Sequence, residues 1–143
     1  MRLRYSWISV GDYKRHGNDL RRRAWLIGHE QDHDNRYNNY LCGVLTSDFQ
    51  TTKNCQATLD AIDQVEAGTR EMSEDWGNAF RITVKRDGVR IEFQTSKRWT
   101  DVIPEDWMET FTIAEFKTAL KGWKQFLELP AVLDMKVEVD LPT

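Results

Sequence analysis

The stretch from residue 29 to residue 33 reads HEQDH and matches the H-E-x-x-H pattern of zinc-dependent hydrolases. On a helix, His29 and His33 would share one face and bind one zinc ion, while Glu30 would act as general base on the metal-bound water. The flanking residues do not favour a helix, because Gly28 precedes the pattern and an Asp-Asn pair follows it. The proposed chemistry therefore depends on whether this stretch is helical and buried.

Zinc also needs a third protein ligand. The remaining histidine, His16, lies in the polar stretch KRHGND, and no apolar stripe runs through residues 28–40 that would bury a helix there. We therefore expect a solvated loop that binds neither a metal ion nor another cofactor. A small metal-dependent hydrolase that uses the His29/His33 loop remains the alternative interpretation of the chain.

The two cysteines are the other candidates for chemistry. Cys42 lies in an apolar run typical of a strand, and Cys55 lies on the apolar stripe of a predicted helix, where a thiol usually behaves as a small hydrophobe. The chain also lacks the G-x-S-x-G, P-loop and G-x-G-x-x-G motifs. We therefore expect a protein that is not an enzyme, and the low cysteine count favours a reducing, cytoplasmic compartment.

Acidic residues are concentrated between residues 60 and 75. This segment contains a single cation, Arg70, among the acids Asp60, Asp63, Glu66, Glu71, Glu74 and Asp75. One interpretation is a solvated helix face followed by a polar loop. The other is an acidic surface that binds a basic protein, with Trp76 as an aromatic anchor, because interface hot spots are rich in aromatic residues. Asp32 and Asp34 form a second acidic cluster that could join this surface.

Length and charge limit the class of partner. The 143 residues fit a single domain spanning residues 1–143. Residues 1–50 contain 8 Lys/Arg and 6 Asp/Glu, whereas residues 51–143 contain 12 and 17. Nucleic-acid partners need clustered positive charge, and the run Arg21-Arg22-Arg23 is more typical of a solvated strand edge. We expect no direct nucleic-acid contact, and no apolar run reaches the ~18 residues that predict a membrane span.

The stretch FTIAEFKTALKGWKQFLELP predicts a long amphipathic helix. Thr112 and Glu115 have the spacing of a capping box, and Pro130 ends the helix. The apolar residues at helical spacing are Ile113, Phe116, Leu120, Trp123 and Leu127. We expect this stripe to be buried, with Trp123 facing the sheet that contains the preceding hairpin.

The stretch NAFRITVKRDGVRIEFQ predicts a β-hairpin. Taking the Asp-Gly pair at residues 87–88 as a two-residue type I′ loop places Val84 opposite Ile91 and Ile82 opposite Phe93. These four side chains then share one apolar face, while the polar side chains take the other.

The remaining patterns complete an α+β domain with a mostly antiparallel sheet and two main helices packed on it. Residues 53–67 have helical spacing, with Gly68 after the last turn. Apolar and polar residues alternate from Leu133 to Leu141, which predicts a strand. In the first fifty residues, the strand candidates are RYSWISV, RAWLIG and NYLCGVL.

Four sequence elements between Leu59 and Leu129 carry a family resemblance. They are the acidic helix, W-G-N-A at residues 76–79, V-x-I-E at residues 89–92, and F-x-x-x-L-x-x-W-x-x-F-L at residues 116–127. In these elements the chain resembles small bacterial immunity proteins of the contact-dependent growth inhibition type, which belong to polymorphic toxin systems. The resemblance implies a non-enzymatic, cytoplasmic protein that binds and neutralises the C-terminal domain of a cognate toxin, commonly a nuclease.

A nuclease partner would be basic, because it must hold phosphates. The predicted contacts are therefore the acidic residues and the neighbouring tryptophan, namely Asp60, Asp63, Glu71, Glu74, Asp75, Trp76, Asp32 and Asp34.

Overall fold

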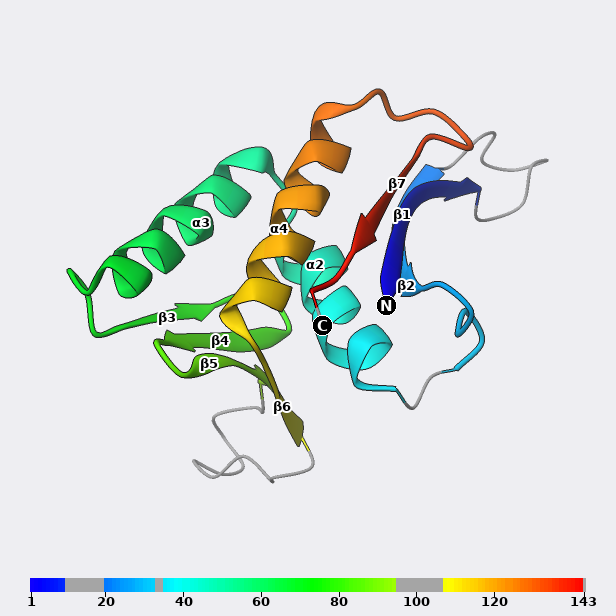
Figure 1. The fold of residues 1–143 in the computed structure, drawn as a ribbon. Helices are drawn as coiled ribbons and strands as arrows, with labels where there is room; N and C mark the ends of the chain where they lie inside the picture. Colours follow the sequence, from blue (N-terminus) through cyan, green and yellow to red (C-terminus); the bar gives the residue numbers. More distant parts are fainter. Residues whose placement is uncertain (10–19, 33–34, 95–106, 143) are drawn as a thin grey trace.

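The computed structural model describes residues 1–9, 20–32, 35–94 and 107–142, and it confirms the predicted α+β class with antiparallel strands (Figure 1). The strands form two sheets rather than one. The first sheet has the order β2-β1-β7, with β1 (Arg2–Ser9), β2 (Leu20–Leu26) and β7 (Lys136–Asp140). The second has the order β3-β4-β5-β6, with β3 (Met72–Trp76), β4 (Phe80–Lys85), β5 (Gly88–Phe93) and β6 (Met108–Phe111).

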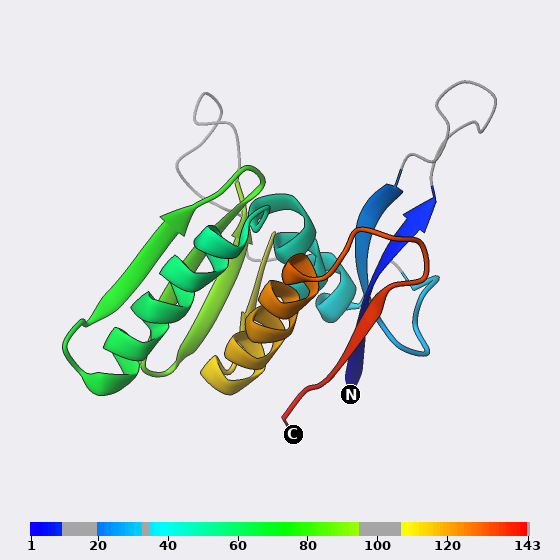
Figure 2. The ribbon, with the colours of Figure 1, turned by 90° about the horizontal axis from the view of Figure 1, so that it is seen from above.

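Two long helices, α3 (Thr52–Ala67) and α4 (Ile113–Glu128), form the layer that joins the sheets. They lie side by side over one face of the second sheet, and α4 also runs beside the first sheet (Figure 2). Gly122 of α4 is buried at this second contact, where an added Cβ would collide with Val139 of β7. The helix therefore approaches the first sheet closely because this position carries no side chain.

The helix predicted after Thr112 is confirmed as α4, and of its predicted apolar stripe Phe116, Leu120 and Trp123 are buried, whereas Ile113 and Leu127 are only partly buried. The Thr112 hydroxyl accepts a hydrogen bond from the Glu115 N–H, and the Glu115 carboxylate accepts one from the Thr112 N–H, each at 3.0 Å. This pair is the predicted capping box. The fully buried side chains of α4 are Phe116, Ala119, Leu120, Trp123 and Phe126.

Trp123 is buried as predicted, but its packing partners lie in the first sheet rather than in the hairpin. Its ring packs edge-on against Tyr5 of β1, with the ring centroids 5.2 Å apart. Its Nε1–H donates to the Phe49 carbonyl at 2.8 Å, and the Tyr5 hydroxyl donates to the Ala119 carbonyl at 2.8 Å. The tryptophan therefore joins α4 to the first sheet and to the segment that precedes α3.

The hairpin is confirmed, but the predicted register is wrong by two residues. Val84 pairs with Val89, and Ile82 pairs with Ile91, whereas the sequence predicted Ile91 and Phe93 as their partners. Because the shift is an even number of residues, every side chain keeps its predicted face. The apolar face formed by Val84, Val89, Ile82 and Ile91 is buried.

Gly88 explains the difference in register. The loop consists of residues 86–87, and Gly88 is the first residue of β5, paired with Lys85. Its φ is +153°, and a Cβ at this position would lie 3.0 Å from the Phe111 carbonyl oxygen of β6. The glycine therefore allows β6 to lie close to β5, and it is not one of the two loop residues.

The strand predicted at NYLCGVL, residues 39–45, is wrong. This segment is helical, with a short π-helix η1 (Tyr37–Cys42) that continues into α2 (Gly43–Asp48). Its buried apolar side chains recur at helical spacing, namely Tyr37, Tyr40, Leu41, Val44 and Leu45. Asparagine and glycine in this stretch have low helix propensity, and burial of the stripe outweighs it.

The other predicted elements are confirmed with changed boundaries. RYSWISV and RAWLIG belong to β1 and β2, although Val10 lies outside the described residues. The Thr51 hydroxyl caps α3, which ends at Gly68 with a left-handed φ of +80°. β7 begins only at Lys136, because residues 133–134 form a turn in which Asp134 has a left-handed φ of +69°. None of the described helices combines the length and the apolar character needed to cross a membrane.

The W-G-N-A element at residues 76–79 forms the turn between β3 and β4, and this turn is fixed against α2. The buried carboxylate of Asp48 accepts hydrogen bonds from the Ala79 N–H at 2.9 Å and from the Phe80 N–H at 3.0 Å. Backbone hydrogen bonds of this kind to a carboxylate are among the stronger ones in proteins. The backbone of the element is therefore structural, while the side chains of Trp76 and Asn78 are exposed.

We expect replacement of Trp123 to destabilise the fold strongly. Trp123→Ala removes a fully buried side chain and its hydrogen bond to the Phe49 carbonyl, so the free energy of unfolding should fall by about 3–5 kcal/mol. Chemical denaturation measures this loss. Trp107 is 43% exposed and provides the control, since Trp107→Ala should change stability by less than about 0.5 kcal/mol. Equal denaturation midpoints for the two variants would contradict the central position of Trp123.

Candidate functional site

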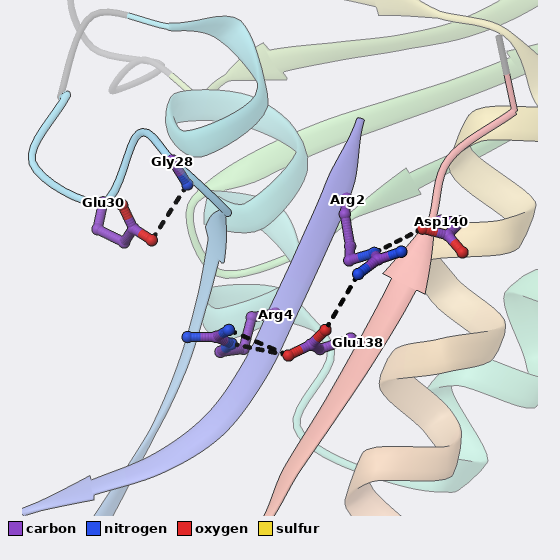
Figure 3. A network of polar contacts seen from close by, with 6 residues as sticks. All are labelled: Arg2, Arg4, Gly28, Glu30, Glu138 and Asp140. Carbon is purple, nitrogen blue, oxygen red and sulfur yellow. Dashed lines mark hydrogen bonds and ion pairs between the residues drawn. The ribbon is translucent and has the colours of Figure 1, made fainter.

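The HEQDH stretch lies between β2 and η1, and its described part, residues 29–32, is a turn-rich loop as predicted. The Gly28 N–H donates to the Glu30 carboxylate at 3.1 Å, and His29 Nδ1 lies 3.8 Å from Asp32 Oδ2 (Figure 3 shows the first contact). His33 and Asp34 lie outside the described residues. Among the residues that the structure describes, no three His, Cys, Asp or Glu side chains are placed to hold a metal ion.

Two of the predicted contact residues, Asp60 and Asp63, are exposed on α3. Lys117 of α4 lies 2.8 Å from Asp63 Oδ1 and 2.8 Å from Glu66 Oε1. The hydrogen bond from Lys117 lowers the pKa of Asp63, and the same bond raises the pKa of Lys117. Asp60 accepts a hydrogen bond from the Gln56 amide at 2.8 Å. This helix surface is less negative than its sequence suggests, because one lysine offsets two carboxylates.

Glu74, Trp76 and Arg81 form an interlocked group on β3 and β4. The Trp76 indole N–H donates to Glu74 Oε1 at 2.8 Å, and the Arg81 guanidinium donates to Glu74 Oε2 at 2.9 Å. Arg81 also lies 4.8 Å from the centroid of the Trp76 ring. The hydrogen bonds from Arg81 and Trp76 lower the pKa of Glu74. Trp76 is still 48% exposed. The contacts with Glu74 and Arg81 therefore hold an exposed ring in one orientation at the surface.

The strand register divides the predicted contact residues between two faces of the second sheet. Glu74 and Trp76 project from the face opposite the helices, whereas Asp75 alternates to the helix side, where its partner Ile82 is buried. Glu71 is exposed just before β3. The structure therefore brings Glu74 and Trp76 together, and it places them on the opposite side of the sheet from the carboxylates of α3.

The helix-free face of the second sheet, here called the polar face, also contains unpaired buried groups. In the described part of the chain, six buried side-chain N or O atoms have no hydrogen-bond partner. Four of them are on this face, namely Arg81 Nε, Thr83 Oγ1, Arg90 Nε and Glu92 Oε1. Arg90 Nε and Glu92 Oε1 lie 2.6 Å apart as an ion pair, without the alignment of a hydrogen bond. Unpaired groups of this kind are uncommon in folded proteins, and here Arg90 and Glu92 still interact with each other through their ion pair.

The first sheet gathers cations on the side that faces away from α4, here called the outer face. Alternation assigns to this face Arg2, Arg4, Ser6 and Ile8 of β1, Arg21, Arg23 and Trp25 of β2, and Lys136, Glu138 and Asp140 of β7. Arg2 lies 2.7 Å from Asp140, and Arg4 lies 3.0 Å from Glu138 (Figure 3). Trp25 lies between two guanidinium groups, with Arg23 4.7 Å and Arg4 6.0 Å from its ring centroid.

The interpretation of the three consecutive arginines as a solvated strand edge misses this face. Alternation sends Arg22 to the opposite side, where it lies 5.5 Å from the Trp7 ring and donates to the Gln50 carbonyl at 2.9 Å. Arg21, Arg23 and Trp25 then share one face at the spacing i, i+2, i+4. That spacing is visible in the sequence, but the cations of β1 and β7 join it only through strand pairing.

The chain matches no family model, and searches among curated proteins and among solved structures give no match.

We expect both thiols to be unreactive in the folded protein. Burial raises the pKa of Cys42 to about 12 and that of Cys55 to about 11, so both remain protonated near neutral pH, and the thiolate is the reactive form. Titration with a thiol-specific chromophore at about pH 8 should therefore be slow for the native chain and rapid for both cysteines after unfolding. A Cys55→Ser variant assigns the signal to Cys42. Fast reaction of either thiol in the native chain would contradict the burial.

Proposed function

We propose that this protein is a non-enzymatic immunity protein that binds a cognate toxin domain in the cytoplasm and neutralises it. The expected partner is the C-terminal domain of a polymorphic toxin, basic in charge and with nuclease activity. The proposal combines the family resemblance at residues 59–129 with the surface that carries Glu74 and Trp76. In this proposal the protein acts by occupying a surface of the toxin, and none of its own side chains takes part in a reaction.

The exposed and rigidly held indole of Trp76 is the observation that carries the proposal. Tryptophan is among the residues most enriched at interface hot spots. Glu74 and Arg81 already fix the orientation of the ring, so little side-chain entropy would be lost when a partner covers it. Trp76 therefore suits the role of a preorganised anchor.

The surroundings of Trp76 fit a basic partner. Glu71 is exposed just before β3, and Glu74 has a lowered pKa, which keeps it charged in mildly acidic conditions as well. Carboxylates at this place would attract a phosphate-binding surface and increase the rate of encounter.

Growth protection tests the proposal directly. The gene next to this one is expected to encode a large secreted protein with a toxic C-terminal domain. Expression of that domain in a bacterial host should arrest growth, and co-expression of this chain should restore growth and give a complex that copurifies. A toxic domain that this chain neither protects against nor binds would overturn the proposal, and so would the location of the gene within a metabolic operon.

Replacement of Trp76 should weaken the complex through loss of the anchor. Trp76→Ala is expected to raise the dissociation constant roughly thirtyfold or more, which corresponds to a hot spot of about 2 kcal/mol. The matched control is Trp107→Ala, because Trp107 has a similar exposure of 43% and lies next to β6, at the other edge of the second sheet. Calorimetry with the toxin domain measures both. Equal losses for the two variants would place the contact elsewhere.

Charge reversal on α3 tests the electrostatic part of the proposal. Changing Asp60 and Asp63 to Lys should slow association strongly at low ionic strength, and the loss should shrink in high salt, where the attraction is screened. Asp63 also loses its ion pair with Lys117, so the control must lose ion pairs too. Reversal of Glu138 and Asp140 on β7 meets this requirement and changes the net charge equally. Equal association rates for both double variants would exclude α3 from the interface.

A further inference from the structure

The outer face of the first sheet has a charge opposite to that of the rest of the chain. Its three strands contribute five cations and two carboxylates, while the whole chain has a net charge of −3. The two carboxylates, Glu138 and Asp140, are paired with Arg2 and Arg4 at one end (Figure 3). The other three cations are Arg21, Arg23 and Lys136, and none of them forms an ion pair with another described residue. Positive charge is therefore concentrated at the end of the face where β1 stops.

Strand pairing arranges these side chains in rows around a hollow. One row runs Lys136–Ser6–Arg23, and the small Ser6 leaves space between the two longer cations. The hollow has a volume of about 520 Å³, and its lining from the sheet comprises Arg4, Ser6, Trp7, Ile8, Ser9, Trp25 and Lys136. Leu133 and Asp134 close one side. The hollow therefore contains the cations Arg4 and Lys136, the carboxylate Asp134 and the Trp25 ring, while Arg21 and Arg23 lie on the same face of β2 outside its lining.

We infer that the outer face of the first sheet binds single-stranded nucleic acid. This inference is independent of the proposed toxin contact, which uses the acidic and polar surfaces of α3 and the second sheet. Cations along the groove would follow the phosphate backbone, and the Trp25 ring with its neighbouring guanidinium groups offers planar surfaces on which bases stack. An open sheet face with an aromatic side chain and flanking cations is a common way for proteins to hold single strands.

The arrangement favours a nucleic acid over an acidic protein for two reasons. First, Arg21 and Arg23 lie two residues apart on one strand, about 6.7 Å, so they present a repeating charge to a repeating anionic backbone. Second, an acidic peptide would bind through hydrogen bonds between its carboxylates and arginine side chains. The two arginines of this face that already donate to carboxylates, Arg2 and Arg4, are occupied by Asp140 and Glu138. The Arg23 guanidinium lies 4.7 Å from the centroid of the Trp25 ring, so a cation for phosphate and an aromatic side chain adjoin on this face.

Fluorescence anisotropy with the full chain tests this inference. The probes are labelled oligouridine RNA and oligothymidine DNA of roughly 12 nucleotides, a length typical of single-strand sites. We expect dissociation constants that are micromolar or weaker at low ionic strength. The logarithm of the association constant should fall linearly with the logarithm of the salt concentration. Similar affinity for both probes would show that phosphates and stacking suffice, whereas tighter binding of RNA would identify contact with the 2′-hydroxyl. Absence of binding to both probes at low ionic strength would overturn the inference.

The three consecutive arginines supply a matched control. Arg21→Gln with Arg23→Gln should weaken binding about tenfold or more and reduce the salt slope by about 1.4, since each phosphate contact on a single strand contributes about 0.7. Arg22→Gln removes the same type of charge from the opposite face and should change the affinity less than twofold. Thermal unfolding establishes that each variant is folded, and Lys136→Gln provides a second test on another strand. Equal loss for Arg22→Gln, or equally tight binding of polyglutamate, would overturn the inference.

Discussion

The burial of α4 between two sheets is the constraint on which the rest of the structure depends. Gly122 lets the helix backbone approach β7, and the neighbouring Trp123 fills the space against Tyr5 and donates to the Phe49 carbonyl. One helix thus packs against the first sheet, the second sheet and the segment that precedes α3. Because a tryptophan must bury its N–H with a partner, this arrangement fixes the orientation of the helix as well as its position.

Helix packing on one face of each sheet leaves the other faces available, and the strand registers determine what those faces carry. On the second sheet, alternation collects Glu74, Trp76 and Arg81 together with a group of unpaired polar atoms. On the first sheet, the same alternation collects arginines around Trp25. The two exposed faces therefore carry different side chains, and we propose a protein partner for one and a nucleic acid for the other.

Local ion pairs change the electrostatic character that charge counting predicts. The acidic segment is partly neutralised by cations from elsewhere in the chain, since Lys117 lies between Asp63 and Glu66 and Arg81 pairs with Glu74. The same effect operates on the first sheet, where carboxylates of β7 neutralise the arginines of one end. Exposed ion pairs of this kind contribute little to stability. Their main effect is to determine where unpaired charge remains on the surface.

The sequence by itself determined the elements whose signals are local. The capping box at Thr112, the stripe of α4, the Gly68 end of α3 and the hairpin face all follow from spacing between neighbours in the chain. It also identified the carboxylates and Trp76 as candidate contacts, because charge and aromatic character are properties of residue type. Tertiary structure decided that residues 39–45 are helical, that Gly88 starts a strand, and that the strands form two sheets, since burial against distant elements outweighs weak local propensity. It alone separated the candidate contacts onto two sides of a sheet, because the β3–β4 register and helix packing decide which face each residue takes. It also created the cationic outer face, because the pairing of β1 with β7 joins residues more than a hundred positions apart.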